Sequence, residues 1–449
     1  MLYKLIGRLV TFLLLPLGLL LTFISANIYD PYLIPLRGWW SAALVVGSVA
    51  VFGALVAGGY VRSKGILGKL LILLWCLPPI AMASAVAIFQ IHKHVVLEAE
   101  GKRAEALGRH FIVGYSSFDE IAALAKKGLI GGVYISHRNV EGRPIDDVKK
   151  EIASLQTIRQ EAGLPPLIVA ADQEGGIVSH MSPLLTPLPA LSTLTPLPPE
   201  ERLAKAESFG QIHGRELASI GITLNFAPVV DLLRQQPNNP LDFHSMISRR
   251  AISEDPAIVS DVALAYVRGL ESAGIEGTLK HFPGLGRIRQ DTHHFRADLN
   301  TPPSELEASD WLPFIQVLAR SNAFLMVGHV AVTAIDPASA ASHSKRVVSG
   351  LIRGQWGFEG IITTDDLVMG PIYEHGVCKA VVEALNSGVD LLLIAYDGLQ
   401  FYRMYHCALT APQGSIDEAM LEKSATRLNS RVVKQQVNMG TPESTNSRD

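Results

Sequence analysis

Short β-rich runs that alternate with amphipathic helical stretches fill the chain from about residue 105 to residue 435, and this alternation restricts the fold more than any other feature. Strands separated by helices form parallel sheets, because each helix returns the chain to the same end of the sheet. Eight strand–helix units suit an α/β fold of the (β/α)₈ TIM barrel type, and a doubly wound open sheet is the alternative. The predicted strands are residues 111–114, 132–135, 167–171, 222–226, 277–279, 324–327, 360–363 and 391–394. The predicted helices include residues 145–161, 199–220, 256–273, 304–319 and 377–387.

Residues 1–93 have a different composition, because three long stretches contain no Lys, Arg, Asp or Glu. Each is long enough to cross a hydrocarbon core of about 30 Å as a helix, so we predict an all-α transmembrane anchor of three helices before the barrel. The predicted spans are residues 9–29, 39–61 and 70–91. A cleaved signal peptide that ends at Ala26 is an alternative for the first stretch, which is long for that role. Buried helices of a soluble domain are a second alternative, which the lack of polar faces disfavours.

Basic residues around the predicted spans set the orientation of the chain. Lys4 and Arg8 precede the first span and three basic residues lie between the second and third, whereas only Arg37 lies between the first and second. The positive-inside rule then places the N-terminus in the cytoplasm and the chain after His92 across the membrane. We therefore expect a multi-pass protein of the bacterial cytoplasmic (inner) membrane, held in the lipid bilayer by its N-terminal helices, with an extracytoplasmic, periplasmic barrel.

Three further segments complete the predicted organisation. Residues 94–109 are rich in Glu, Lys and Ala and are expected to form a helical stalk, residues 110–435 form the barrel, and the polar residues 436–449 form a disordered tail. The net charge of −3 gives no electrostatic reason to expect a nucleic-acid partner. The sequence makes no prediction about the oligomeric state.

The chain contains three cysteines, which are too few for a disulfide framework. Cys76 lies in an apolar run, so Cys378 and Cys407 are the one conceivable pair. Sequence order alone does not establish whether their Cα atoms come within bonding range. We expect both to be free thiols in the core, with a disulfide as the alternative.

Ionisable residues follow five of the predicted strands at the end where barrel enzymes place their chemistry. A single such residue would be read as a capping or structural group, but five together at one rim indicate a shared polar pocket. They are Asp172 and Glu174 after the third strand, Asp231 after the fourth, Lys280 and His281 after the fifth, His329 after the sixth, and Asp365 and Asp366 after the seventh.

These residues favour glycoside cleavage over metal chemistry. His281, His293, His294 and His329 are the candidate zinc ligands, but no HExxH motif occurs and the adjacency of His293 and His294 hinders joint ligation. We therefore predict no metal and no other cofactor. Without a metal, a carboxylate and a proton donor cleave a glycoside when one attacks the anomeric carbon and the other protonates the departing oxygen.

Asp365 and the pair Asp291–His293 suit these two roles. Asp365 ends an apolar strand that aims it rigidly, whereas the neighbouring Asp366 is expected to make structural hydrogen bonds. Asp291 lies two residues before His293 and can fix the tautomer of the imidazole and raise its pKa, so that the pair gives a proton and later takes one from water. Both lie on a loop at 284–295, which we expect to be mobile enough to reach over a sugar. The alternative is that Asp291 caps the loop and His293 is a surface histidine.

Four short motifs at the predicted strand ends occur in a specific order and spacing. They are Asp-Gln-Glu-Gly-Gly at residues 172–176, Asn-Phe-Ala-Pro-Val-Val-Asp at 225–231, Lys-His-Phe-Pro-Gly at 280–284 and Thr-Asp-Asp-Leu at 364–367. Together they resemble glycoside hydrolase family 3, in particular its single-domain β-N-acetylglucosaminidase (β-hexosaminidase) branch, over roughly residues 105–435. The resemblance implies a retaining mechanism through a glycosyl-aspartate intermediate, with Asp365 as the nucleophile and His293 of the Asp291-Thr292-His293 triplet as the acid/base.

The resemblance also implies the residues that contact the sugar and reveals three departures from the family pattern. Ile177 and His180 stand where the family usually has Arg, and Leu285 stands where His is common. We include His180 among the predicted substrate-binding residues because of its position. The other predicted sugar contacts are Asp172, Arg250, Lys280 and His281.

These features predict an exo-glycosidase that hydrolyses terminal β-linked N-acetylglucosamine (N-acetylhexosamine) from a cell-wall or other envelope glycan, such as a peptidoglycan fragment. A glycoside phosphorylase or another exo-β-glycosidase on the same barrel is one alternative, because a histidine donor does not repel incoming phosphate as a carboxylate would. A non-catalytic glycan-binding protein is the other alternative. The three departures favour it, whereas the presence of both Asp365 and His293 opposes it.

Overall fold

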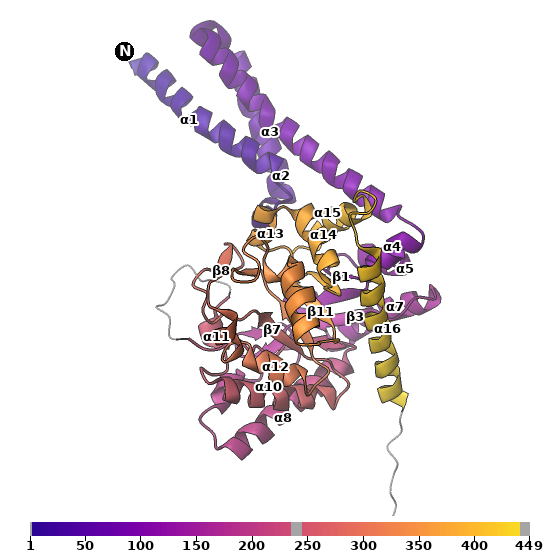
Figure 1. The fold of residues 1–449 in the computed structure, drawn as a ribbon. Coiled ribbons are helices and arrows are strands. Elements are labelled where there is room, and N and C mark those ends of the chain that lie inside the picture. The colour runs from indigo at the N-terminus through magenta and orange to yellow at the C-terminus, as the bar shows by residue number, and fades with distance from the viewer. Residues whose placement is uncertain (1, 235–244, 441–449) are drawn as a thin grey trace, which may run out of the picture. The chain divides into compact units, whose positions relative to one another are not determined.

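The computed structural model describes residues 2–234 and 245–440, and the chain divides into two compact units. The first unit, residues 1–98, is helical in its described part, and the second, residues 99–449, contains all the described β-strands (Figure 1). The predicted polar tail begins within helix α16 (Glu418–Gly440), and its residues 441–449 lie outside the described part of the chain.

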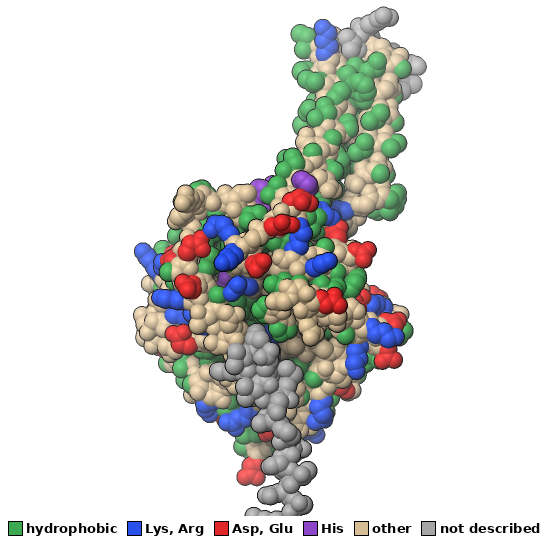
Figure 2. Space-filling model, turned by 90° about the vertical axis from the view of Figure 1, so that its right-hand side faces the viewer, with side chains coloured by type: hydrophobic (Ala, Val, Ile, Leu, Met, Phe, Trp, Pro, Cys, Tyr) green, Lys and Arg blue, Asp and Glu red, His purple; other side chains and the backbone are tan. Residues whose placement is uncertain are grey.

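Three apolar α-helices make up most of the first unit: α1 (Leu2–Ala26), α2 (Trp39–Ala57) and α3 (Tyr60–Leu97). They pack on one another around Trp75, whose indole N–H donates to the carbonyl of Leu14 at 3.2 Å. Many of their other large apolar side chains are exposed, and Figure 2 shows hydrophobic side chains over the visible surface of these helices. A surface of this kind is unfavourable in water and suits an apolar environment.

Two helical segments of the described chain are long and apolar enough to cross a membrane, Trp39–Ala57 and Gly65–Leu97. The described apolar part of α1, Thr11–Ala26, is shorter. Gly65 has a φ of 58° and marks a kink in α3, so the long apolar segment begins at the kink and not at the start of the helix. Helices therefore cover the second and third predicted spans, whereas an anchor of three membrane-crossing helices stays a prediction.

Eight parallel strands form one nearly closed sheet in the second unit (Figure 1). Their order is β6–β3–β2–β1–β12–β11–β9–β7, and isolated bridges from Leu224 to Glu276 and from Val229 to Lys280 connect the two ends of this order. The strands are β1 (Phe111–Gly114), β2 (Gly132–Ile135), β3 (Ile168–Ala171), β6 (Leu224–Asn225), β7 (Thr278–Phe282), β9 (Phe324–Val327), β11 (Ile362–Asp366) and β12 (Leu391–Ile394). Each predicted strand run contributes one of them, which confirms the α/β class and favours a barrel over an open sheet.

Residues on both faces of these strands are buried, because one face lines the interior of the sheet and the other packs against helices. Side chains of the interior face, including Ile112, Ile168 and Met326, form one core cluster. Four predicted helices agree with the observed bounds within two residues: α7 (Ile145–Glu161), α8 (Pro199–Ser219), α10 (Pro256–Glu271) and α14 (Val377–Ser387).

The single helix predicted over residues 304–319 is wrong, because two short helices occupy this segment, α11 (Pro303–Glu307) and α12 (Leu312–Leu318). Trp311 between them is fully buried and donates its indole N–H to the carbonyl of Pro283 at 3.0 Å. Proline is tolerated in the first turn of a helix, where its missing N–H costs nothing, and Pro313 lies in the first turn of α12. Burial of Trp311 therefore stabilises the break between α11 and α12, although the sequence pattern favours one continuous helix.

A disulfide joins Cys378 of α14 to Cys407 of α15 (Gln400–Leu409), and their Cα atoms lie 5.0 Å apart. The prediction of two free thiols is therefore wrong. The two helices flank β12 in the sequence and contact each other in the fold. This contact between neighbouring helices brings the two Cα atoms within bonding range, and spacing along the chain does not reveal it.

Replacing Cys378 and Cys407 together by serine is expected to lower the free energy of unfolding by about 3–4 kcal/mol, because the bond joins positions 29 residues apart and restricts the unfolded chain. Denaturant titration of the detergent-solubilised protein, with and without a thiol reductant, measures this difference. The parent protein should lose the stability on reduction, and the double serine variant should not respond. Equal responses of the two proteins would contradict the prediction.

Candidate active site

The carboxyl end of β11 carries two adjacent aspartates with different surroundings. The carboxylate of Asp366 accepts the backbone N–H groups of Val368, Ala395 and Tyr396 at 3.1, 3.0 and 2.8 Å. It thereby holds the turn after β11 to the chain after β12, which confirms the structural hydrogen bonds expected of it. Asp365 accepts the backbone N–H of Asp366 at 2.8 Å.

The two carboxyl groups also differ in their pKa values. Burial raises the pKa of Asp366 to about 6, although backbone N–H groups oppose the rise. Burial acts in the same direction on the pKa of Asp365, but nearby histidines, foremost His281, outweigh it and hold that pKa below its ordinary value. Asp365 is therefore ionised at neutral pH, which is the state that nucleophilic attack requires.

The loop after β7 places Asp291 and His293 beside the end of β11. Oδ1 of the fully buried Asp291 lies 3.0 Å from Nδ1 of His293 and accepts the backbone N–H of His293 at 3.1 Å. A carboxylate at Nδ1 fixes the tautomer and leaves Nε2 to exchange protons. The carbonyl of His293 accepts the N–H of Gly370 at 2.8 Å, which ties the loop to the turn that follows β11. The side chain of His293 is 37% exposed and hence accessible to a ligand.

Four charged side chains form a buried ion-pair network at the carboxyl ends of β3 and β7. Lys280 contacts both Asp172 and Glu174, with 2.6 Å from Nζ to Oε1 of Glu174. Arg250, from the short helix α9 (Ile247–Arg250), binds the same carboxylate twice, at 3.0 Å from Nε and 2.6 Å from Nη2. Two positive and two negative charges attract one another strongly enough to offset part of the cost of removing them from water.

Exposure and pKa values within this network follow from the pairing. The side chains of Lys280, Glu174 and Arg250 are at most 8% exposed, whereas that of Asp172 is 18% exposed. Burial favours a higher pKa for both carboxyl groups, but Lys280 and Arg250 hold the pKa of Glu174 below its ordinary value. Lys280 and the imidazole of His180 do the same for the pKa of Asp172. All four groups are therefore charged at neutral pH.

Tyr134 of β2 links this network to His180. Its hydroxyl oxygen lies 2.8 Å from Oδ2 of Asp172 and 2.8 Å from Nδ1 of His180, so the hydroxyl donates to the carboxylate and accepts from the imidazole. Tyr134 was not among the residues predicted from the sequence. The sequence does contain a signal for it. Successive side chains of a strand point to opposite faces, so Tyr134 points to the face of β2 opposite to that of its neighbours Val133 and Ile135.

His281 connects the network to Asp231. Nδ1 of His281 lies 2.7 Å from Oδ2 of Asp231, which also accepts the backbone N–H of His281 at 3.2 Å. Nη2 of Arg250 lies 3.3 Å from Nε2 of the same ring. The imidazole is therefore held on both sides, by Asp231 and by Arg250.

The two other departures from the family pattern have unlike surroundings. Leu285 is buried, and its backbone N–H donates to Oδ1 of Asp231 at 2.7 Å. Ile177 is 41% exposed on the turn between β4 (Gln173–Gly175) and β5 (Val178–Ser179). Leu285 therefore contributes its backbone N–H and a buried apolar side chain, whereas Ile177 is exposed to solvent.

The structure brings the predicted site residues to the carboxyl rim of the sheet, and it shows the partners of three further side chains. These are Tyr134, which the sequence did not place at the rim, and Glu174 and His329, which it did; Nε2 of His329 donates to the carbonyl of Asp366 at 2.9 Å. Glu174 and His329 were visible as strand-end residues, but only the fold shows their partners.

Comparison with known proteins agrees with this geometry. The model of the glycosyl hydrolase family 3 N-terminal domain matches residues 104–431. The chain belongs to glycosyl hydrolase family 3. A β-hexosaminidase of Xanthomonas oryzae pv. oryzae is 33% identical to this family 3 protein over 274 residues, which cover 60% of this chain and 78% of that relative. The resemblance carried by the four motifs is confirmed, and the protein is a β-hexosaminidase-like glycoside hydrolase.

Solved family 3 structures have the same fold. A β-N-acetylglucosaminidase from Paenibacillus sp. str. FPU-7 matches with a TM-score of 0.68 and 28% identity, and the match covers 78% of this chain but 65% of that one. A β-N-acetylhexosaminidase from Beutenbergia cavernae DSM 12333 matches with a TM-score of 0.65 and 25% identity, and the match covers 75% of this chain and 100% of that one. The family 3 chain thus spans slightly less than two thirds of the Paenibacillus enzyme.

Proposed function

We propose that this family 3 protein is a retaining exo-β-N-acetylhexosaminidase that releases terminal β-linked N-acetylglucosamine from a cell-wall or other envelope glycan. The observation that carries the proposal is the ionised Asp365 beside the Asp291–His293 pair at one rim of the sheet. The similarity to a β-hexosaminidase and to a β-N-acetylglucosaminidase supports the choice of sugar.

Two displacements at the anomeric carbon account for the reaction. In the first, Asp365 attacks the carbon while protonated His293 gives the Nε2 proton to the departing glycosidic oxygen, so that a glycosyl-aspartate forms and the aglycone leaves. In the second, neutral His293 takes a proton from water, and the water oxygen attacks the same carbon and frees the carboxylate of Asp365. Two inversions restore the β configuration. Asp291 is a positioning residue that holds the imidazole and stabilises its charged form.

The buried ion-pair network binds the sugar in this proposal. Asp172 is its most exposed carboxylate and is best placed to accept sugar hydroxyl groups. The carboxylates are held by Lys280, Arg250 and His281, which also supply hydrogen-bond donors to the sugar. His180 joins this set of donors through its hydrogen bond with Tyr134. Because these groups already bind one another, little side-chain ordering is left for substrate binding to complete.

We further infer that the three N-terminal helices anchor the protein in the cytoplasmic membrane with the barrel on the periplasmic side. The exposed apolar side chains of α2 and α3 support the anchor. The disulfide between Cys378 and Cys407 supports an oxidising compartment for the barrel. Membranes washed with alkaline carbonate should retain the protein, and protease added to spheroplasts should digest the barrel. Release by carbonate, or a fully protected barrel, would contradict this placement.

Detergent-solubilised full-length protein is expected to release 4-nitrophenol from 4-nitrophenyl N-acetyl-β-D-glucosaminide, and proton NMR should detect the β anomer of the free sugar first. The α anomer as first product would contradict the retaining mechanism. Inorganic phosphate in the assay separates hydrolysis from phosphorolysis, because a phosphorylase would form sugar 1-phosphate in place of free sugar. Glycan binding without turnover would identify a non-catalytic protein.

A further inference from the structure

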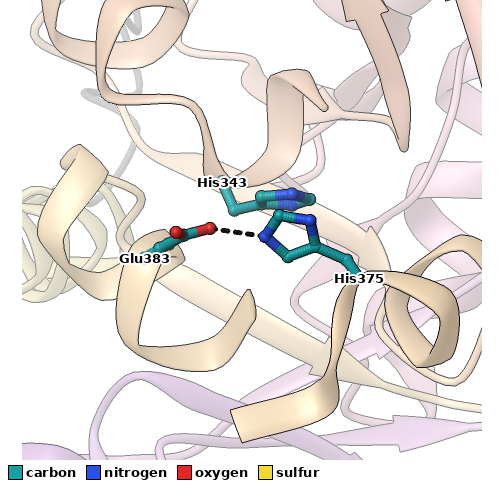
Figure 3. Close-up of side chains that lie close together, drawn as sticks. All are labelled: His343, His375 and Glu383. Atoms are coloured by element: carbon teal, nitrogen blue, oxygen red, sulfur yellow. Dashed lines mark hydrogen bonds and ion pairs between the residues drawn. The ribbon is translucent and has the colours of Figure 1, made fainter. Parts of the chain in front are cut away.

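Two histidines and a glutamate from three separate elements lie close together (Figure 3). His343 ends the 3₁₀ helix η3 (Ala341–His343), His375 ends α13 (Gly370–His375), and Glu383 lies on α14. One ligand atom from each side chain lies within 4.8 Å of the other two. Nε2 of His375 is 2.7 Å from Oε2 of Glu383, and the two imidazole rings are tilted by 43° with their centroids 4.4 Å apart.

His343 carries a buried nitrogen without a hydrogen-bond partner. Its Nε2 atom is buried and unpaired among the described residues, and the residue is only 4% exposed. Buried polar atoms nearly always have a partner, and at this nitrogen, inside a cluster of ligand side chains, a bound ion would supply one.

A chain of hydrogen bonds decides which nitrogen of His343 holds the lone pair. The chain starts at the carbonyl of Asp366, which only accepts, so Nε2 of His329 must carry a proton to bond it at 2.9 Å. Burial lowers the pKa of His329, so this ring is neutral and its Nδ1 accepts from the hydroxyl of Ser342 at 2.8 Å. The hydroxyl has one proton, so Ser342 must accept from Nδ1 of His343 at 3.1 Å. In the neutral ring Nε2 of His343 then holds a lone pair, and no donor among the described residues bonds it.

We propose that His343, His375 and Glu383 form a zinc site, with Nε2 of each imidazole and the carboxylate as ligands and water in the fourth position. Two imidazoles and a carboxylate are a ligand set that zinc accepts in tetrahedral geometry. The side chains of His375 and Glu383 are 14% and 33% exposed, so an ion and a water molecule can reach the site. Zinc ligands lie about 2.0–2.2 Å from the metal. The three ligand atoms lie up to 4.8 Å apart, so the proposed binding requires rotation of these two partly exposed side chains, with loss of their mutual hydrogen bond.

The hydrogen-bond chain gives this site a connection to the rim. Metal bound at Nε2 of His343 strengthens the donor at Nδ1, which bonds Ser342 and through it His329. His329 in turn bonds the backbone of β11 at Asp366. The zinc is therefore a structural ion outside the reaction, and its ligation stabilises the position of the strand end. The proposal does not depend on which sugar the protein cleaves.

Zinc binding to the full-length protein in detergent, after removal of metal with a chelator, tests the proposal. Isothermal titration with zinc chloride is expected to show one high-affinity ion per chain, and saturating zinc should raise Tm by several degrees. The isosteric substitution Glu383→Gln and the substitution His375→Gln should each weaken that affinity at least 10-fold. Substitution of cobalt for zinc should give the intense visible absorption of a tetrahedral ion.

His137→Gln is the matched control, because His137 and Glu141 form an exposed His–Glu pair, 3.8 Å apart, outside this cluster. Its zinc affinity should equal that of the parent protein. The proposal is overturned if the parent binds no zinc with high affinity. It is also overturned if Glu383→Gln and His375→Gln bind zinc as tightly as the parent, which would place the ion on other histidines. None of these readouts uses substrate, so failure here is separate from failure of the proposed hydrolysis.

Discussion

Replacing Asp365 by asparagine is expected to reduce kcat about 10⁴-fold or more, with little change in Tm. The amide has the shape of the carboxylate and its oxygen can still accept the backbone N–H of Asp366. It lacks the negative charge that His281 and His293 stabilise, and it cannot form the glycosyl ester. Steady-state kinetics with the 4-nitrophenyl substrate and thermal unfolding of the same samples measure both quantities.

A shorter side chain at this position separates a nucleophile from a structural residue. Asp365→Ala leaves space for a small anion, so added azide should restore release of 4-nitrophenol and yield the α-glycosyl azide, the product of a single inversion. Asp366→Asn is the matched control, and it should lower Tm because an amide NH₂ cannot accept the N–H of Tyr396. Hydrolysis at the parent rate in either Asp365 variant would remove this residue from the mechanism.

Replacing Glu174 by alanine is expected to lower the free energy of unfolding by about 3–5 kcal/mol and to raise KM several-fold, because two buried cations would then share one carboxylate. Glu174 pairs with both Lys280 and Arg250 at 2.6 Å. Glu418→Ala is the control, since Glu418 also pairs with an arginine at 2.6 Å, but the side chains of Arg103 and Glu418 are 46% and 66% exposed. That change should cost less than about 1 kcal/mol. Equal losses in the two variants would contradict a special role for burial.

Glu174 stabilises the folded state over a defined range of pH. Burial would raise its pKa, but Arg250 and Lys280 hold the pKa below the ordinary value of 4.5. The folded state therefore binds this proton less tightly than the unfolded state, and the stability from Glu174 is present above pH 4.5. It is lost as the pH falls through the folded-state pKa. The difference in unfolding free energy between the parent and Glu174→Gln should accordingly shrink in acid.

The strands and the strand-end residues were predictable because both depend on local pattern. Each apolar run of the sheet is short and bounded by polar residues, and the ends of parallel strands share one edge. Asp365 and Lys280 were found in this way. The Asp291–His293 contact was also predictable, since two residues of separation suffice for a carboxylate to reach Nδ1.

The remaining features depend on which distant segments become neighbours, and local pattern does not contain this information. Cys378 and Cys407 bond because α14 packs beside α15. The partners of Tyr134 and Glu174 come from other strands and from α9. His343 and His375 are not predictable as a pair, because each is a single histidine outside any motif and only the fold brings them together. Trp311 interrupts a helical pattern because its burial site lies beside Pro283, a residue of another segment.

The order of strands in the sheet also determines when each strand can pair during synthesis of the chain. β1 is the first strand to leave the ribosome, and one of its two neighbours is β12, paired from Phe111 to Leu392. Because synthesis adds about 5–20 residues per second, β12 emerges roughly 15–55 s after β1. Until then the backbone groups on that edge of β1 lack the partner that the folded sheet gives them. Cys378 and Cys407 bracket β12, so their oxidation follows the arrival of the last strand, and the disulfide retains that strand once the sheet has closed.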